Sequence, residues 1–317
     1  MLTLANPFYE TRLGQAYNGD ALDLISSLPD QSVNLVLTSP PFALTRKKEY
    51  GNESAAKYVE WFLPFARQFR RILADDGSFV LDLGGAYLPG VPVRSIYQYE
   101  LLVALVKEVG FYLAQEFFHY NPSRLPAPAE WVTVRRIRVK DAVNVVWWLS
   151  VSPYPKADNR RVLKEYSEAM LTLLRNGYKP KLRPSGHDIS PKFRRTHGGA
   201  IPPNVLNLPL DAPANIIPLA NTESNSKYLR RCKEVGVKPH PARFPLAFAD
   251  FFIKMTTDVG DTVLDPFAGS NATGAAAEAL ERKWIAFELS EAYVRGSMLR
   301  FDLAPAEPVL PFPDDKA

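Results

Sequence analysis

The sequence predicts an α/β protein with a doubly wound, mostly parallel sheet and a smaller inserted region. Short apolar runs alternate with stretches of helical periodicity in the first 120 residues and again from residue 224. Two of these runs end in turns rich in proline or glycine, at 38–42 and 265–274. The alternation stops between residues 121 and 217, where prolines and basic residues accumulate. Strands that alternate with helices favour a parallel sheet covered by helices on both faces.

The first half of the chain supplies the first elements of this sheet. Residues 33–37 form a short apolar run that stops at Pro40, which is typical of a buried parallel strand. Apolar residues then recur at nearly helical spacing from 56 to 73, so we expect a helix there, kinked or split at Pro64. The next expected elements are a strand at 78–83, a helix at 99–109 capped by Gly110, and a strand at 111–118.

The middle of the chain is predicted to be an insertion in this pattern. Its expected elements are strands at 131–139 and 142–149, a helix at 160–175 and a long loop at 179–218. From residue 224 the alternation resumes, with helices at 226–234 and 246–257, strands at 262–264 and 284–287, and a helix after each strand. Residues 304–317 are rich in proline and acids and are expected to form a flexible tail.

Composition limits the class of protein. A chain of 317 residues with 46% hydrophobic content can bury a large core, in one large domain with a smaller partner. Cys232 is the only cysteine, which excludes an intramolecular disulfide and a thiolate-rich zinc site. The four histidines lack metal-binding spacing, so no metal is expected. We expect a cytoplasmic protein, because neither a secretory signal nor a membrane-spanning apolar run is found.

Basic charge is concentrated in the middle of the chain. Residues 121–200 contain 16 Lys and Arg against 6 Asp and Glu, a local balance of +10 within a net charge of +4. The remainder of the chain therefore sums to −6. This asymmetry is the electrostatic pattern of a nucleic-acid-binding surface, although a solvated basic face would give the same count.

The turn at 265–274 has the features of a cofactor-binding loop. Val263 and Leu264 form a short strand before it, and Gly269 allows close approach of a ligand to the backbone before a helix begins near Ala275. An ordinary turn and helix start is the alternative. A phosphate-binding loop is excluded because Ala275 follows Gly274 where Lys would be required, and the dinucleotide fingerprint Gly-x-Gly-x-x-Gly is absent.

Two motifs together resemble the S-adenosylmethionine-dependent amino-DNA methyltransferases. They are Thr-Ser-Pro-Pro-Phe at 38–42 and Asp-Pro-Phe-Ala-Gly-Ser-Asn-Ala-Thr-Gly at 265–274, and the similarity extends to 46–52, 240–245 and 282–288. Ser39 and Phe42 favour the subgroup that methylates cytosine N4, because relatives that methylate adenine N6 commonly have Asp or Asn first and often Tyr last. Adenine N6, an RNA or protein substrate, and a non-catalytic DNA-binding regulator are the alternatives.

The resemblance implies a Rossmann-like methyltransferase sheet in circularly permuted order, with the catalytic motif before the cofactor motif. Such reordering is physically allowed, since chain ends that lie close together can be joined and the chain reopened elsewhere. It implies a catalytic half at 1–120, a target-recognition region at 121–220, a cofactor-binding half at 221–303 and the tail at 304–317. It also implies duplex DNA as substrate and a separate restriction endonuclease as a possible partner. The sequence leaves monomer or homodimer open.

Ser39, Pro40, Pro41 and Phe42 are the expected catalytic residues. Ser39 Oγ and the Pro40 carbonyl would accept the two amino protons, Pro41 would stiffen the turn, and Phe42 would stack on the base. The target nucleotide must leave the duplex for direct in-line transfer. A covalent route through Cys232 is not expected, because no proline precedes this residue.

Glu288, 19 residues after Gly269 at the end of an apolar run, is expected to accept the ribose hydroxyls of the cofactor, unless it is a helix N-cap. Asp265 is implied to bind the ammonium, and Asn271 replaces a second glycine common in relatives. The other expected cofactor-binding residues are Pro266, Phe267, Ala268, Gly269, Ser270, Asp20 and Pro245.

Nine basic residues are candidates for DNA binding, with some expected to read guanine edges and others to bind phosphate. They are Lys47, Lys48, Arg135, Arg136, Arg138, Arg183, Lys192, Arg194 and Arg195. Each of these side chains could instead be a solvated loop charge. Trp147 and Trp148 are expected in the core rather than against a base.

Overall fold

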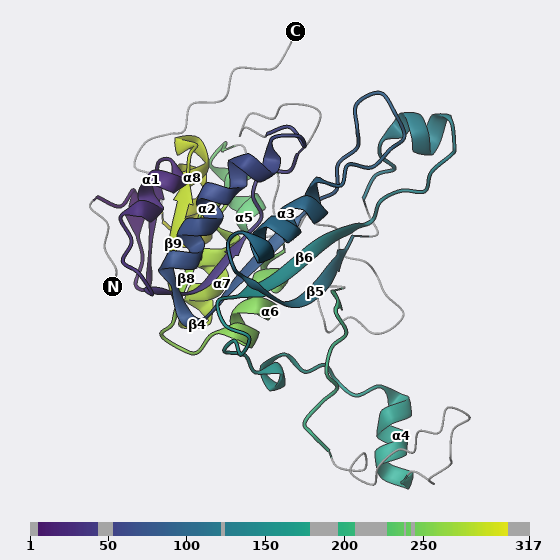
Figure 1. Ribbon diagram of the computed structural model, residues 1–317. Coiled ribbons are helices and arrows are strands. Elements are labelled where there is room, and N and C mark those ends of the chain that lie inside the picture. The colour runs from purple at the N-terminus through teal and green to yellow at the C-terminus, as the bar shows by residue number, and fades with distance from the viewer. Residues whose placement is uncertain are drawn as a thin grey trace.

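The computed structural model describes residues 6–43, 53–121, 124–177, 196–206, 227–237, 239–241 and 245–303. Nine strands form one sheet in the order β1-β2-β9-β8-β3-β4-β6-β5-β7 (Figure 1). Their bounds are Tyr9–Glu10 (β1), Gly14–Asn18 (β2), Val33–Thr38 (β3), Leu73–Leu83 (β4), Tyr112–Tyr120 (β5), Val143–Ser150 (β6), Val205–Leu206 (β7), Thr262–Asp265 (β8) and Lys283–Glu288 (β9).

The centre of the sheet is parallel. β2, β9, β8, β3 and β4 pair in parallel with their neighbours in that order, whereas β6 is antiparallel to both β4 and β5. The parallel strands therefore end at one common edge of the sheet. The predicted α/β class with a mostly parallel sheet is confirmed.

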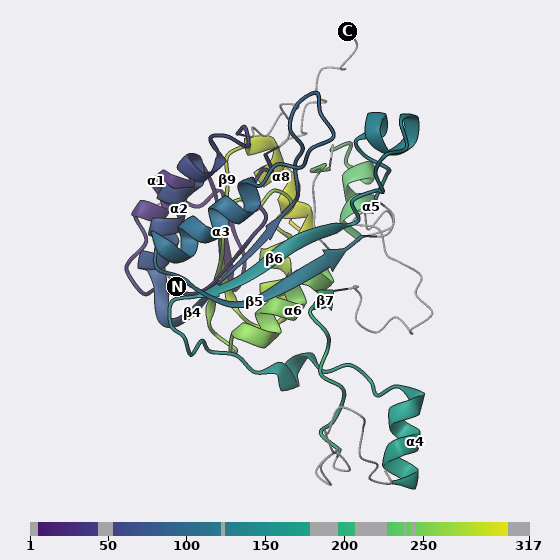
Figure 2. The same cartoon turned by 45° about the vertical axis from the view of Figure 1, so that its right-hand side comes forward.

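Helices cover both faces of this sheet (Figures 1 and 2). One apolar core contains buried residues of α1 (Ala21–Ser26), α2 (Tyr58–Ile72) and α3 (Tyr97–Lys107). A second core contains buried residues of α6 (Leu246–Thr256), α7 (Ala272–Ala279) and α8 (Glu291–Ser297). The other α-helices of the described residues are α4 (Glu168–Asn176) and α5 (Lys227–Glu234). The sheet is thus the middle layer of three, as doubly wound folds require.

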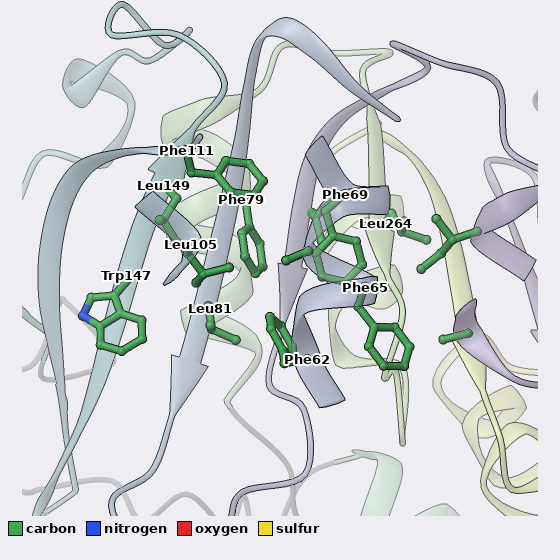
Figure 3. Packing of buried hydrophobic residues seen from close by; sticks show 14 of the residues in the cluster. Phe62, Phe65, Phe69, Phe79, Leu81, Leu105, Phe111, Trp147, Leu149 and Leu264 are labelled. Atoms are coloured by element: carbon green, nitrogen blue, oxygen red, sulfur yellow. The ribbon is translucent and has the colours of Figure 1, made fainter. Parts of the chain in front are cut away.

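Aromatic side chains fill the first core (Figure 3). Phe62, Phe65 and Phe69 lie on one side of α2 because residues three or four apart share a helix face. Phe69 packs edge-on against Phe79 of β4, with ring centroids 5.1 Å apart. Pro64 lies inside α2 without splitting the helix.

Trp147 and Trp148 confirm the prediction that they are core residues. Both are buried, and they belong to different apolar clusters because successive residues of a strand face opposite sides. β6, which carries them, lies between β4 and β5 in the main sheet. The stretch 121–220 therefore contributes an interior strand of the sheet in addition to inserted segments.

The predicted strand at 131–139 is wrong. Residues Glu130–Val134 form a π-helical turn and a loop follows. The backbone closes on itself there, since the N–H groups of Ile137 and Arg138 both donate to the Trp131 carbonyl. Arg136 has a left-handed φ of +55°, which a strand does not contain. The segment has a strand-like composition because five of its residues are β-branched: Val132, Thr133, Val134, Ile137 and Val139. None of the described strands pairs with it, however.

The helix expected at 160–175 is shorter and begins later. A 3₁₀ turn occupies Asn159–Val162, and α4 begins only after Ser167, whose side chain accepts a hydrogen bond from the Met170 N–H. This serine N-cap sets the helix start. In both views α4 lies apart from the sheet, below it, whereas the Glu130–Val134 turn lies beyond the start of β6 at the upper right (Figures 1 and 2).

Candidate active site

The two predicted site turns meet at the carboxyl edge of the sheet. β3 and β8 are neighbours, with Leu35 opposite Val263 and Val36 opposite Leu264. At the ends of these strands Thr38 Oγ1 donates a 2.7 Å hydrogen bond to Asp265 Oδ1. The turns that begin at Ser39 and Pro266 are therefore side by side, although 227 residues separate the two bonded side chains.

Asp265 holds these two turns together. Besides Thr38, its carboxylate accepts hydrogen bonds from Thr273 Oγ1 at 2.6 Å and from the Phe267 N–H at 3.1 Å. The side chain is 2% exposed, and burial raises the pKa of its carboxyl from the ordinary 3.8 to about 6 despite the three donors. A direct contact between Asp265 and the cofactor ammonium stays a prediction.

The raised pKa of Asp265 makes stability depend on pH. Because the folded protein favours the neutral acid, this stabilisation is present below pH 4 and is lost as pH rises through about 6. A difference of about two pH units corresponds to about 3 kcal/mol in the free energy of unfolding. Urea unfolding at pH 4 to 8 measures it. Asp265→Asn, which cannot ionise, should show a smaller decline with rising pH, and an equal decline would contradict the assignment.

The Ser39 turn is fixed from several sides. Ser39 Oγ donates to Asp82 Oδ2 at 3.2 Å, and Tyr58 of α2 donates its hydroxyl hydrogen to the Pro41 carbonyl at 2.8 Å. The Phe42 ring lies against Gly84, where any side chain would collide with it. Ser39 itself is half-buried. The turn that carries the serine hydroxyl is thus held at the edge of the sheet by partners from β4 and α2.

The turn after β8 uses two left-handed residues. Gly269 has a φ of +52°, and its N–H donates to Glu288 Oε2 at 2.8 Å. Asn271 has a φ of +54° and caps α7 by accepting the Gly274 N–H at 2.9 Å. Asparagine tolerates this conformation better than most side chains. The structure thereby explains how Asn271 can stand in place of the second glycine that the resemblance implies.

Backbone N–H groups orient the Glu288 carboxylate, whose contact with the cofactor ribose stays a prediction. Its Oε2 accepts from Gly269 and its Oε1 accepts from the Ser290 N–H at 2.9 Å. Burial raises the pKa of this carboxyl above its ordinary value. The Leu289 N–H also hydrogen-bonds this carboxylate. An ionised carboxylate offers about four acceptor positions, so acceptor capacity remains for a ribose hydroxyl. The N-cap of α8 is Ser290, which removes the alternative that Glu288 is that cap.

The other predicted cofactor residues lie at the same edge or support it. Asp20 caps α1 by accepting the Leu22 N–H at 2.8 Å, and the adjacent Gly19 N–H donates to the Glu288 carbonyl at 3.1 Å. Phe267 packs on Phe65 with ring centroids 5.2 Å apart. Pro266 and Ala268 flank Phe267, and Ser270 accepts from Arg300 through its Oγ at 2.9 Å. Pro245 is the N-cap residue of α6. Their contacts with a cofactor stay predictions.

Sequence reasoning missed a buried polar cluster beside Ser39. Asp82 of β4, His119 of β5 and Asn144 of β6 are all buried on adjacent strands. Asn144 Nδ2 donates to Asp82 Oδ2 at 3.5 Å. The available signal was a polar residue within each of the apolar runs 79–83 and 143–149.

The structure places three of the predicted DNA-binding residues. Arg135 pairs with Glu130 at 2.7 Å, Arg136 is exposed, and Arg138 lies over the Tyr87 ring and donates to the Pro92 carbonyl. All three belong to the turn and loop that replace the expected strand. Lys47, Lys48, Arg183, Lys192, Arg194 and Arg195 lie outside the described residues.

Membrane-spanning helices and metal-binding clusters are both absent from the described residues. Within these ranges, no helix combines the length and apolar character needed to cross a membrane. In the same part of the chain, His, Cys, Asp and Glu side chains form no cluster of three or more suited to a metal ion. Cys232 is buried in α5 with Tyr228 and Val237 as cluster neighbours.

Comparison with known proteins gives consistent matches over almost the whole chain. A type II methyltransferase of Proteus hauseri, M.PvuII, is 52% identical over 298 residues, which cover 93% of this chain and 85% of that protein. The solved structure of the cytosine-N4-specific PvuII DNA methyltransferase matches with a TM-score of 0.73 at 46% identity, over 93% of this chain and 88% of the other.

A more distant structure extends the likeness of the fold. The M1.HpyAVI complex with SAM matches with a TM-score of 0.52 at 18% identity, over 92% of this chain and 100% of the other. The family described as DNA methylase, of the N6/N4 methyltransferase type, matches residues 33–299. The matched residues include the Ser39 turn, the Gly269 turn and the strands that carry Asp82, His119 and Asn144. The chain therefore belongs to the N6/N4 DNA methylase family.

Proposed function

We propose that the protein transfers a methyl group from S-adenosylmethionine to the exocyclic N4 of cytosine in a specific sequence of duplex DNA. The observation that carries this proposal is the hydrogen bond between Thr38 and Asp265, which sets the Ser-Pro-Pro-Phe turn beside the Gly269 turn. The likeness to the cytosine-N4-specific PvuII enzyme supports the choice of atom.

The cofactor is held by groups of this chain at the carboxyl edge of the sheet. Glu288 accepts the ribose hydroxyls, and the turn at the left-handed Gly269, whose N–H holds Glu288, lies beside the methionine end. Phe267 and Trp61, with ring centroids 6.0 Å apart, provide an apolar wall. When bound, S-adenosylmethionine supplies an electrophilic methyl group on its sulfonium sulfur.

The protein supplies orientation to a weak nucleophile. The amine lone pair of cytosine is delocalised into the ring, so acceptors must draw on both amino protons to free it. Ser39 Oγ and the Pro40 carbonyl are these acceptors, and Phe42 stacks on the base. Because the amine is buried in duplex DNA, the nucleotide has to leave the stack before in-line transfer.

Target recognition belongs to the segments around β6. We assign target recognition to the parts of 121–220 outside this strand. Residues 1–120 are the proposed catalytic half, and residues 221–303 are the proposed cofactor-binding half. We also propose that the protein acts in the cytoplasm. There it would protect DNA from a separate restriction endonuclease that cuts the same sequence. The name of the type II relative supports this setting.

Removing two exposed arginines should weaken DNA binding without changing the reaction. Arg135 and Arg136 lie beyond the start of β6, where this loop would meet phosphate. Log affinity falls linearly with log salt concentration. Replacing both arginines by alanine should make this fall shallower, reducing the magnitude of the slope by about one for each phosphate that is no longer bound. Fluorescence anisotropy at several salt concentrations measures this slope. Arg67→Ala is the matched control, because Arg67 is an exposed arginine on α2, outside the segments assigned to target recognition.

Sequencing that detects modified bases tests the proposed function. DNA from cells expressing the chain should contain N4-methylcytosine in one sequence context, and DNA from cells with the empty vector should not. N6-methyladenine in place of N4-methylcytosine would overturn the choice of atom. An unmodified genome, together with methylation of RNA or protein by the purified chain, would overturn the substrate.

A further inference from the structure

A short hairpin leaves the carboxyl edge of the sheet between β4 and α3. It occupies residues 84–96, and the Leu88 N–H closes it by donating to the Val93 carbonyl at 2.8 Å. The chain reverses at Gly90, whose φ of +75° is left-handed. The hairpin rises beyond the end of β4, on the same side of the sheet as the Glu130–Val134 turn (Figures 1 and 2).

The base of this hairpin touches the Ser39 turn. Any side chain at Gly84 would collide with the Phe42 ring, and the Gly84 carbonyl accepts a hydrogen bond from the Tyr97 hydroxyl. Leu88 follows Gly84 by four residues, so its Cα lies no more than about 14 Å away. The tip of the hairpin is therefore within reach of DNA whose target base is held at Ser39.

The tip exposes apolar side chains. Leu88, Val91 and Val93 are 43%, 41% and 48% exposed, and Pro89 is exposed as well. Scattered apolar residues are ordinary on a protein surface. Here four of them fall within six consecutive residues at the end of a projecting hairpin, which marks an interaction surface.

Side-chain contacts hold the hairpin in place. Arg94 pairs with Asp141 at 3.1 Å, and the Tyr87 hydroxyl donates to the same carboxylate at 2.6 Å. Arg138 lies over the Tyr87 ring, 5.1 Å from its centroid, and donates to the Pro92 carbonyl. The hairpin and the loop before β6 therefore form one rigid unit, so the apolar tip is positioned before any ligand binds.

Basic charge borders the apolar tip. Residues 130–141 contain four Lys and Arg against two Asp and Glu, and Arg94 of the hairpin adds another positive charge. Duplex DNA has the complementary arrangement, because stacked apolar bases lie between two rows of phosphates. Charge complementarity and the position beside the Ser39 turn thus select duplex DNA as the partner of this surface.

We propose that Leu88, with Pro89 beside it, is an apolar wedge that enters the base stack and fills the space that the target cytosine leaves. The proposal rests on the proposed function, because a wedge is needed only if the nucleotide leaves the duplex. Leucine and proline are among the side chains that proteins insert between base steps to unstack them. A hairpin that is already fixed loses little conformational freedom on insertion.

Leu88→Ala tests the wedge by shortening it while the turn at Pro89 and Gly90 stays. The substrate is a duplex with the sequence context that is found methylated in cells, and the cofactor carries a tritium-labelled methyl group. On the fully paired duplex we expect the single-turnover rate to fall by about tenfold or more. Affinity for the duplex should stay within about threefold of wild type, because phosphate contacts dominate it.

A second duplex separates a wedge from a merely structural role. Its target cytosine faces an abasic site, so no base pair has to be broken. On this duplex Leu88→Ala should transfer label at the rate of wild-type protein. Leu88→Met, which keeps the side-chain volume, should restore the rate on the paired duplex. A 2-aminopurine base beside the target cytosine, which brightens when stacking is lost, should brighten less with Leu88→Ala than with wild type.

Leu113→Ala is the matched control. Leu113 is a leucine of almost the same exposure, 42%, but it lies at the start of β5, at the opposite edge of the sheet. Its replacement should leave the rate on both duplexes unchanged.

Four outcomes would overturn the wedge: a wild-type rate of Leu88→Ala on the paired duplex, an equal loss on both duplexes, an equal loss in Leu113→Ala, or a wild-type dimer in sedimentation that Leu88→Ala converts to monomers. The last would mean that a second copy of the chain covers the tip. Failure of the proposed function would look different, because wild-type protein would then transfer label to neither duplex.

Discussion

Ser39→Ala is expected to lower the single-turnover rate of methyl transfer by about 100-fold or more while cofactor binding is retained. The hydroxyl is half-buried at the meeting point of the two turns and is held by Asp82. Alanine removes the acceptor for an amino proton and leaves the backbone turn in place. Quench-flow measurement of tritium incorporation gives the rate, and equilibrium dialysis gives cofactor affinity.

The control for this variant is another serine-to-alanine change outside the site. Ser26 is exposed at the end of α1 and bonds to the nearby Asp23 carbonyl at 2.6 Å. Ser26→Ala should keep the wild-type rate. An unchanged rate in Ser39→Ala would remove the serine hydroxyl from the mechanism.

Glu288→Ala is expected to weaken binding of S-adenosylmethionine by about 100-fold or more. Hydrogen bonds to a charged acceptor contribute about 1.5 to 3 kcal/mol each, and loss of two of them changes affinity by at least this factor. The substitution also frees the Gly269 and Ser290 N–H groups that hold the turn. Isothermal titration calorimetry measures the change.

Glu291→Ala is the matched control for the cofactor site. Glu291 is an exposed acid in the first turn of α8, three residues away, and pairs with Arg295 at 2.6 Å. Its loss should leave cofactor affinity unchanged. Normal affinity in Glu288→Ala would mean that the ribose hydroxyls are bound elsewhere.

The central strands could be predicted from sequence because they are buried on both faces. β3 and β8 are short, nearly continuous apolar runs ended by proline or by a turn, and both were found within one residue of their bounds. Since parallel strands end at one edge, the meeting of the two site turns followed from pairing β3 with β8. The aromatic face of α2 was likewise visible as helical spacing.

The segment before β6 shows where local composition misleads. Its β-branched residues predicted a strand, but strand formation depends on a partner, and β5 and β6 already pair with each other. The cluster of Asp82, His119 and Asn144 was missed for a related reason. These residues are 62 positions or fewer apart but become neighbours only through the strand order β4-β6-β5. That order depends on tertiary pairing, which sequence periodicity does not report.

Mass spectrometry of nucleosides shows whether the chain methylates cytosine N4 and whether this needs Ser39. Duplex DNA would be incubated with the full chain and S-adenosylmethionine carrying a deuterium-labelled methyl group, then digested and analysed. We expect labelled N4-methyldeoxycytidine with wild-type protein and almost none with Ser39→Ala. Label on adenine N6 or on a cytosine ring carbon, or equal label with both proteins, would contradict it.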